Sequence, residues 1–84
     1  MPSLWFVYAL RCSDGTFYTG STNNLARRLT QHAAGRGAKY LRGKSPVTLV
    51  YAKAYRGRGL ALRAERRLKA LTRAQKAALI RHEA

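Results

Sequence analysis

The sequence predicts an α+β domain whose elements follow in the order ββαβαα. Short segments rich in β-branched and aromatic residues, which favour strands, alternate with segments whose apolar residues recur at helical spacing. The chain has 84 residues, so one hydrophobic core of ordinary size uses nearly all of it. We therefore expect a single domain over residues 1–84, with a small three-stranded mixed or antiparallel sheet flanked by helices.

The first two strands are expected on either side of a short turn. Residues 4–10 (LWFVYAL) are apolar at both alternating positions. This pattern is typical of a strand that is covered on both faces and is therefore central in its sheet. A second strand is expected over residues 16–21, after the turn-forming residues Ser13-Asp14-Gly15.

The length of this turn decides which way Tyr8 and Tyr18 point. A two-residue hairpin loop would place the two phenols on opposite faces of the sheet. Ser-Asp-Gly is better suited to a three-residue loop, in which a type I turn is closed by a glycine in the left-handed conformation. This register pairs Tyr8 with Gly20, so both phenols lie on the same face and the ring of Tyr8 can cover the glycine.

A helix is expected over residues 25–34, with Asn23 or Asn24 as its cap and Gly35 at its end. Its predicted apolar stripe comprises Leu25, Leu29 and Ala33. Arg28 and His32 are four residues apart, so they share a face of this helix and can reach one phosphate together.

The second half of the chain predicts one more strand and two more helices. A basic loop over residues 36–45 leads to a strand over residues 47–51, and a helix begins at Leu60. The apolar stripe expected for that helix comprises Leu60, Ala64, Leu68 and Leu71. A final helix follows the capping residue Thr72 and runs toward Ile80.

The charge of the chain indicates an anionic partner. Seventeen Lys and Arg residues against three acidic ones give a formal net charge of +14, spread among apolar residues along a folded chain. Nucleic acid, chiefly DNA, is the expected partner. Contacts to it are expected from Arg27, Lys39, Tyr40, Arg42 and Lys44. Tyr40 can either stack on a base or close the core.

Other partners and compartments are not favoured by the sequence. No apolar run is long enough to span a bilayer, and no obligate protein partner is readable. Cys12 is the only cysteine, so an intrachain disulfide and a zinc–thiolate cluster are both excluded. A small buried side chain is the expected role of Cys12, and the cytoplasm is the expected location.

The three acidic residues limit how the chain can hold metal ions. Asp14 is explained by its turn, and Glu83 is the penultimate residue. Glu65 remains, and its spacing favours an ion pair with Lys69, four residues on. Two metal ions held by protein carboxylates are therefore not expected.

Several motifs, in their order and spacing, resemble the GIY-YIG nuclease superfamily over nearly the whole chain. These motifs are Phe6-Val7-Tyr8, Tyr18-Thr19-Gly20, Asn24-Leu25-x-x-Arg28 with His32, and Glu65 on a later helix. Three further segments resemble its small single-domain bacterial branch, namely Gly37-Ala38-Lys39-Tyr40, residues 46–51 and residues 69–73. The sequence departs from the family pattern at Phe6, where the first motif has Gly, and at Ser21, where several members carry Lys. The last helix also has no Asn, which some members place near the site.

The resemblance implies an endonuclease that hydrolyses DNA phosphodiester bonds, with repair or recombination as the expected setting. It implies that Tyr8 and Tyr18 supply paired phenols, that Arg28 binds the scissile phosphate and that His32 assists. It also implies that Glu65 holds a single Mg²⁺ or Mn²⁺. The sequence leaves open whether Tyr8 or His32 is the general base. A basic nucleic-acid-binding module that kept the fold without the chemistry is the alternative, and a structural RNA-binding protein ranks third.

Overall fold

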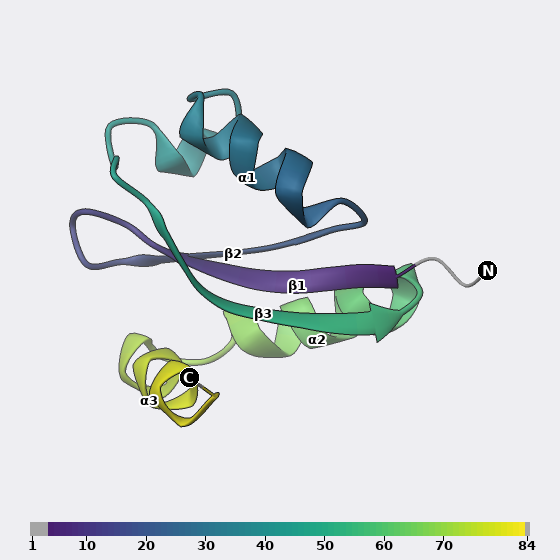
Figure 1. Ribbon diagram of the computed structural model, residues 1–84. Helices are drawn as coiled ribbons and strands as arrows, with labels where there is room; N and C mark the ends of the chain where they lie inside the picture. The colour runs from purple at the N-terminus through teal and green to yellow at the C-terminus, as the bar shows by residue number, and fades with distance from the viewer. Residues whose placement is uncertain (1–3, 84) are drawn as a thin grey trace.

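Three strands and three α-helices follow one another in the predicted order, ββαβαα, with one added turn of 3₁₀ helix (Figure 1). The computed structural model describes residues 4–83. The strands are β1 (Leu4–Arg11), β2 (Phe17–Thr22) and β3 (Thr48–Arg56). The helices are α1 (Leu25–Ala33), η1 (Lys39–Leu41), α2 (Arg58–Lys69) and α3 (Arg73–Glu83).

The three strands form one antiparallel sheet in the order β2-β1-β3, so β1 is the central strand, as its sequence predicts. The predicted three-residue turn between β1 and β2 is confirmed. Cys12 N donates to Thr16 O at 2.8 Å, and Gly15 has the left-handed φ of 82°. The resulting register pairs Tyr8 with Gly20.

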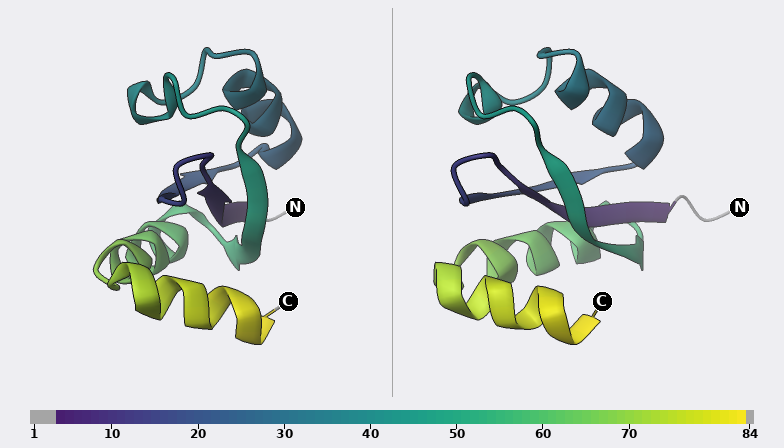
Figure 2. Two further views of the ribbon diagram at one scale, coloured as in Figure 1. Left: turned by 90° about the vertical axis from the view of Figure 1, so that its left-hand side faces the viewer. Right: turned by 60° about the vertical axis from the view of Figure 1, so that its left-hand side comes forward.

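The molecule has three layers, with α1 and the following loop on one face of the sheet and α2 and α3 on the other (Figures 1 and 2). The side chains of β1 alternate between these layers. Val7 packs with Ala61, Ala64 and Leu68 of α2. The next residue, Tyr8, belongs to the cluster on the α1 side, which is made of Tyr8, Leu10, Cys12 and Leu41. Cys12 is thus buried, as predicted.

The strand β3 is longer than predicted, because it continues from Tyr51 to Arg56. Ala52, Lys53 and Ala54 have low strand propensity, but they pair with β1 over its whole length. The central strand needs hydrogen-bonding partners on both of its edges, and this requirement overrides local propensity. The chain then turns at Gly57, whose φ is 106°.

The buried faces of α1 and α2 differ from the predicted stripes. Ala33 of α1 is exposed, and the preceding His32 is buried instead. Helix α2 begins at Arg58 rather than Leu60, and Leu60 is 50% exposed while Ala61 is fully buried. The small Ala61 and Ala64 let the helix lie close to the sheet, which a leucine at either position would prevent.

Side-chain caps fix the starts of two helices. Asn24 Oδ1 accepts a hydrogen bond from Arg27 N at 3.0 Å, which starts α1. Thr72 and Gln75 form a reciprocal capping box at the start of α3, with bonds of 3.1 and 2.9 Å. Both caps are among the residues predicted for this role.

Candidate active site

The site begins with the close approach of Tyr8 to Gly20, its partner across the strands. A Cβ atom placed on Gly20 would lie 2.7 Å from Tyr8 Oη and 3.2 Å from Tyr18 Cε2. Glycine is therefore the residue that lets the Tyr8 ring fold over β2. The predicted role of Gly20 as the residue under the ring has a direct structural basis.

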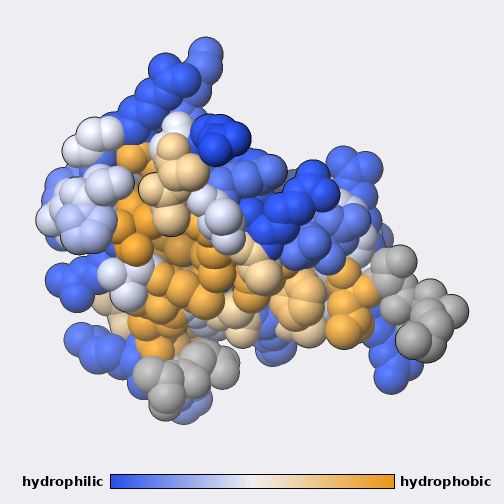
Figure 3. Space-filling model, turned by 45° about the horizontal axis from the view of Figure 1, so that its top comes forward, coloured by the Kyte–Doolittle hydropathy of each residue, from blue (hydrophilic) through white to orange (hydrophobic). Residues whose placement is uncertain are grey.

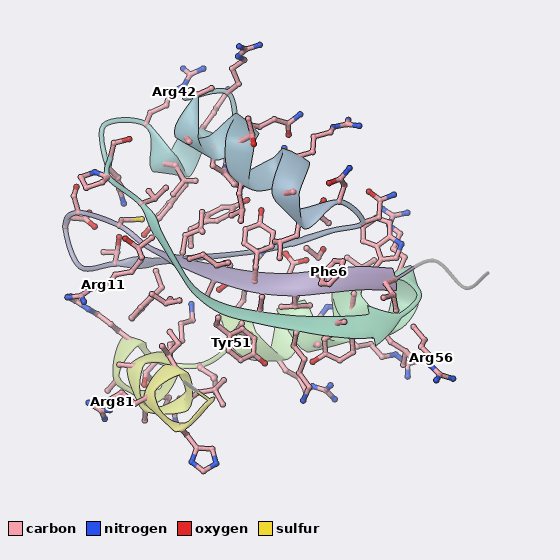
Figure 4. The ribbon with its side chains drawn as sticks, in the orientation of Figure 1. Phe6, Arg11, Arg42, Tyr51, Arg56 and Arg81 are labelled. Atoms are coloured by element: carbon pink, nitrogen blue, oxygen red, sulfur yellow. The ribbon has the colours of Figure 1, made fainter. Side chains whose placement is uncertain are left out.

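Two phenols and an imidazole meet between the sheet and α1. Tyr8 Oη lies 2.8 Å from Nε2 of His32, in a buried hydrogen bond. The ring of Tyr18 lies 6.3 Å from the ring of Tyr8 and 5.5 Å from that of His32, centroid to centroid. Figure 4 shows ring side chains filling the space between α1 and the sheet. Tyr8 is 1% exposed and His32 is 4% exposed, so the pair is shielded from solvent.

Arg28, one turn before His32, places a guanidinium beside the two phenols. Hydrogen bonding to Tyr8 is the largest of the influences that raise the pKa of Arg28, and Tyr18 adds to it. Arg28 Nη1 also donates to Gln31 Oε1 at 3.1 Å. Arg28 is half-buried whereas the adjacent Arg27 is exposed.

The electrostatics of the site keep both members of the buried pair uncharged near neutral pH. Burial raises the pKa of Tyr8, and the charges of Tyr18 and Glu65 add to this rise while Arg28 opposes it. Burial and then the charge of Arg28 lower the pKa of His32. The 2.8 Å hydrogen bond therefore joins a phenol and an imidazole that are both uncharged and share one proton between Tyr8 Oη and His32 Nε2.

Glu65 reaches this region from the opposite layer. Ser21 Oγ donates to Glu65 Oε1 at 2.5 Å, and Lys69 Nζ lies 2.7 Å from Glu65 Oε2. Burial alone would raise the pKa of Glu65, but the hydrogen bonds from Lys69 and Ser21 and the charge of Lys69 lower it. The carboxylate is therefore ionised at neutral pH, and the ion pair predicted with Lys69 is present.

Ser21 connects Glu65 to the side of the site where Arg28 lies. An open pocket of about 230 Å³ beside the start of α1 is lined by Ser21, Arg27 and Arg28, among other residues. The first turn of α1 contains no acidic residue. The two guanidiniums therefore make this pocket suited to an anion such as a phosphate.

The donor set suits one hydrated divalent ion and not a pair of them. Within residues 4–83, no group of three or more His, Cys, Asp or Glu side chains converges. Glu65 offers one ionised carboxylate, and Mg²⁺ commonly keeps several waters when it is bound by one or two carboxylates and substrate phosphates. A single Mg²⁺ or Mn²⁺ on Glu65 is therefore compatible with these residues.

The basic loop contributes Tyr40 and Lys44 to the edge of the site, while other predicted contacts lie apart. Tyr40 is 44% exposed, with its ring 5.9 Å from that of Tyr18, and Lys44 Nζ lies 3.6 Å from the centre of the Tyr40 ring. Lys39 and Arg42 are exposed, and Arg42 points away from the sheet (Figure 4). It is Leu41, not Tyr40, that closes the core.

Two residues to which the sequence assigned no supporting role hold the site together. A Cβ atom on Gly37 would overlap Nδ1 of His32, so the loop backbone lies against the imidazole and covers it. Ser21 holds Glu65. Neither role shows in local sequence patterns, because the first depends on how the loop after α1 folds back and the second on a contact between distant segments.

The chain is similar to known proteins over most of its length. The family model described as the GIY-YIG catalytic domain matches residues 4–78. A UPF0213 protein of Nitratidesulfovibrio vulgaris is 53% identical over 92% of this chain and 70% of its own length. The UPF0213 protein YhbQ of Escherichia coli K12 is 50% identical over 90% of this chain and 76% of its own length.

Two solution NMR structures are similar to this one. A UPF0213 protein from Bacillus halodurans is 43% identical, with a TM-score of 0.60 over 92% of this chain and 82% of its own. A protein from E. faecalis is 38% identical, with a TM-score of 0.65 over 98% of this chain and 90% of its own.

None of the helices within residues 4–83 has the length and hydropathy needed to cross a bilayer.

Proposed function

Because the chain belongs to the GIY-YIG family, among its small UPF0213 members, we propose that it is an endonuclease that hydrolyses DNA phosphodiester bonds with one Mg²⁺ or Mn²⁺ ion. The observation that carries the proposal is the buried hydrogen bond of 2.8 Å between Tyr8 and His32, beside Arg28. Such a pair of titratable groups with opposed pKa shifts is typical of a site for proton transfer.

Tyr8 and His32 are the groups that accept the proton of the attacking water. The guanidinium of Arg28 acts on the phenolic oxygen of Tyr8, and in the proposed relay the phenolic proton lies on the 2.8 Å bond to His32 Nε2. Tyr8 then takes a proton from water as it passes its own to His32. This relay resolves the difficulty that the pKa of Tyr8 is raised, because the phenol never has to persist as a free phenolate.

The substrate itself opens the buried site. Tyr8 is 1% exposed, so a covering group has to move before water reaches its oxygen. Arg28 is the group that a phosphate attracts, since a guanidinium binds phosphate through two parallel hydrogen bonds. When Arg28 turns to the scissile phosphate it leaves the hydroxyl of Tyr8, and Tyr18 remains to orient the reactants.

The added negative charge is stabilised from both sides of β2. Arg28 acts from α1, and Glu65 of α2 would hold the divalent ion, which would supply Lewis-acid stabilisation of the phosphate. Lys69 has to release Glu65 Oε2 for this, so we expect Lys69 to bind a neighbouring phosphate instead. The basic residues around the site, Arg27 and Lys44 among them, hold the strand in place.

Cleavage of labelled plasmid, flapped and four-way-branched DNA tests the proposal. The parent protein is expected to cut at least one of these with Mg²⁺ or Mn²⁺ and none with EDTA, at matched ionic strength. Glu65→Gln is expected to bind DNA as the parent does without cutting it, and Arg28→Ala to bind and cut more weakly than the parent. Arg63→Ala, which removes an exposed arginine of α2, is the matched control for charge.

Two results would contradict this function. Equal cutting by the parent and Glu65→Gln would remove the metal role of Glu65. Tight binding of every substrate without cutting, with either metal, would favour the binding module that keeps the fold without the chemistry.

A further inference from the structure

A second concave surface lies on the other face of the sheet, between the β1–β2 hairpin and α3. It is an open groove of about 610 Å³. Its floor is apolar and includes Phe17, Val50, Ala77 and Ile80, and its rim carries Arg11, Arg73 and Arg81. We call it the arginine groove. Because side chains alternate along a strand, Arg11 lies on the same face of β1 as Val7. The groove therefore faces away from the layer that holds Tyr8.

The fold brings Arg11, near the start of the chain, together with two arginines of the last helix. Arg11 ends β1, while Arg73 and Arg81 lie two turns apart on one side of α3. The guanidinium of Arg73 lies against the hairpin turn, because a Cβ atom on Gly15 would be 2.7 Å from Arg73 Nη2. Figure 4 labels Arg11 and Arg81 at this same end of the molecule.

The arginines of the groove have no acidic side chain beside them among the described residues that line it. None of the nine described residues that line it is acidic. Asp14, next to Gly15 in the turn, is occupied by hydrogen bonds from Thr16 and by Lys44, whose Nζ lies 3.4 Å away. The three arginines that line the groove carry like charges, and a bound anion would offset the repulsion between them.

The floor restricts which anion fits. Phe17, Val50 and Ile80 are only half-buried, so they present apolar area that a bare phosphate would leave uncovered. A nucleobase covers such a floor by stacking and apolar contact, while its phosphate reaches the arginines. The volume of about 610 Å³ lies in the usual range of ligand pockets, roughly 300 to 1,000 Å³.

We propose that the arginine groove is a nucleotide-binding site, with the phosphate on Arg11, Arg73 and Arg81 and the base against Phe17 and Ile80. It gives the protein a second contact with nucleic acid, on the face opposite the tyrosine site. The nucleotide is either part of a strand or free in solution, since both present the same chemistry. The proposal goes beyond cleavage, because it requires neither a metal ion nor the reaction at Tyr8.

Nuclear magnetic resonance of the full, ¹⁵N-labelled chain without metal tests the site directly. The probes are AMP and a single-stranded thymidine hexamer. We expect either probe to shift the backbone amides of Phe17, Val50, Ala77 and Ile80. Shifts with AMP would show that a free nucleotide suffices, and shifts with the hexamer alone would assign the groove to a strand. The absence of groove shifts with both probes would overturn the proposal.

Paired variants separate a built site from general positive charge. Arg73→Ala with Arg81→Ala is compared with Arg63→Ala with Arg66→Ala, which removes two exposed arginines of α2. The groove variant is expected to bind the hexamer about tenfold more weakly, with a log-log salt slope smaller by about 1.4, at roughly 0.7 for each phosphate that the variant no longer neutralises. The control is expected to keep the groove shifts, and equal weakening in both pairs would contradict the proposal.

A third variant tests the floor without changing charge. Ala77→Leu adds three carbon atoms to the groove and keeps every arginine, so we expect it to reduce the shifts at Phe17 and Ile80. The amide spectrum of each free variant shows whether it is folded. Because no metal is present, this result is independent of cleavage: Glu65→Gln should show the same groove shifts as the parent.

Discussion

At the scale of single residues, the site depends on two side chains, Tyr8 and His32, that lie very close to the backbone of a glycine. The approach of Tyr8 to Gly20 follows from the sequence, because the Ser-Asp-Gly turn fixes the register of the two strands. The burial of His32 does not. A histidine in the last turn of a short helix resembles a surface residue, and only the fold of the following loop brings the backbone at Gly37 over its ring.

Gly20→Ala is predicted to destabilise the fold, because its methyl group would collide with Tyr8 Oη and Cζ, at 2.7 and 2.8 Å. Overpacking of this kind costs about 1–3 kcal/mol in the free energy of unfolding. Urea denaturation measures it. Gly59→Ala is the matched control, since nothing lies within 4 Å of its Cβ position in α2. The control should gain up to about 1 kcal/mol from helix propensity, and a similar gain for Gly20→Ala would contradict the packing described.

His32 predicts a dependence of stability on pH. Its pKa in the folded state is lowered from the ordinary 6.5 by burial, so the unfolded chain binds more protons between the two values. This contribution to stability is therefore complete above about pH 6.5 and is lost as the pH falls toward the folded pKa. Urea unfolding at a series of pH values from about 7.5 down to about 4.5 measures the loss. His32→Gln should flatten the curve in this range and His82→Gln, at an exposed site, should not.

At the scale of elements, periodicity and caps predict the order of the helices and strands, while tertiary pairing sets their ends. Asn24 and Thr72 are recognisable as caps because their side chains bond to nearby backbone. The extension of β3 through Ala52 and Ala54 is not recognisable, since it depends on the partner strand β1. Likewise, whether Leu60 or Ala61 faces the sheet depends on where α2 begins, and Gly57 sets that start.

Helix α1 carries both Arg28 and His32, so its cap is predicted to matter for stability and activity together. Asn24→Ala removes the bond of 3.0 Å to Arg27 N and should cost about 1 kcal/mol in the free energy of unfolding. Cleavage should fall as well, because Arg28 and His32 are then held less firmly. Asn23→Ala, one residue earlier and exposed, is the control. Equal effects of the two changes on urea denaturation would show that Asn24 is not the cap.

At the scale of the whole molecule, a small fold displays positive charge on both faces of one sheet. The net charge of +14 follows from composition, but its division between the tyrosine site and the arginine groove does not. Arg11 is far in the sequence from Arg73 and Arg81, and only the docking of α3 against the hairpin end of the sheet joins them. Apolar surface runs between hydrophilic regions in Figure 3, and Leu4 and Leu49 are among the exposed apolar side chains.

This charge predicts strongly salt-dependent binding to duplex DNA. If some five phosphates are neutralised, the slope of log affinity against log salt is about −4 to −5. Fluorescence anisotropy over a series of salt concentrations measures it. Arg28→Ala should make the slope shallower by about 0.9, the value for one phosphate contact on duplex. An unchanged slope would mean that Arg28 does not bind a phosphate.

The most direct test of the account is the cleavage rate of Tyr8→Phe under single-turnover conditions with Mg²⁺ or Mn²⁺. Phenylalanine keeps the ring over Gly20 and removes only the hydroxyl that lies 2.8 Å from His32 Nε2. We predict a loss of roughly 10²- to 10⁴-fold, as for removal of a general base, with DNA affinity unchanged and with Tyr55→Phe cutting at the parent rate. A Tyr8→Phe protein that cuts as fast as the parent would contradict the central role of the Tyr8–His32 pair.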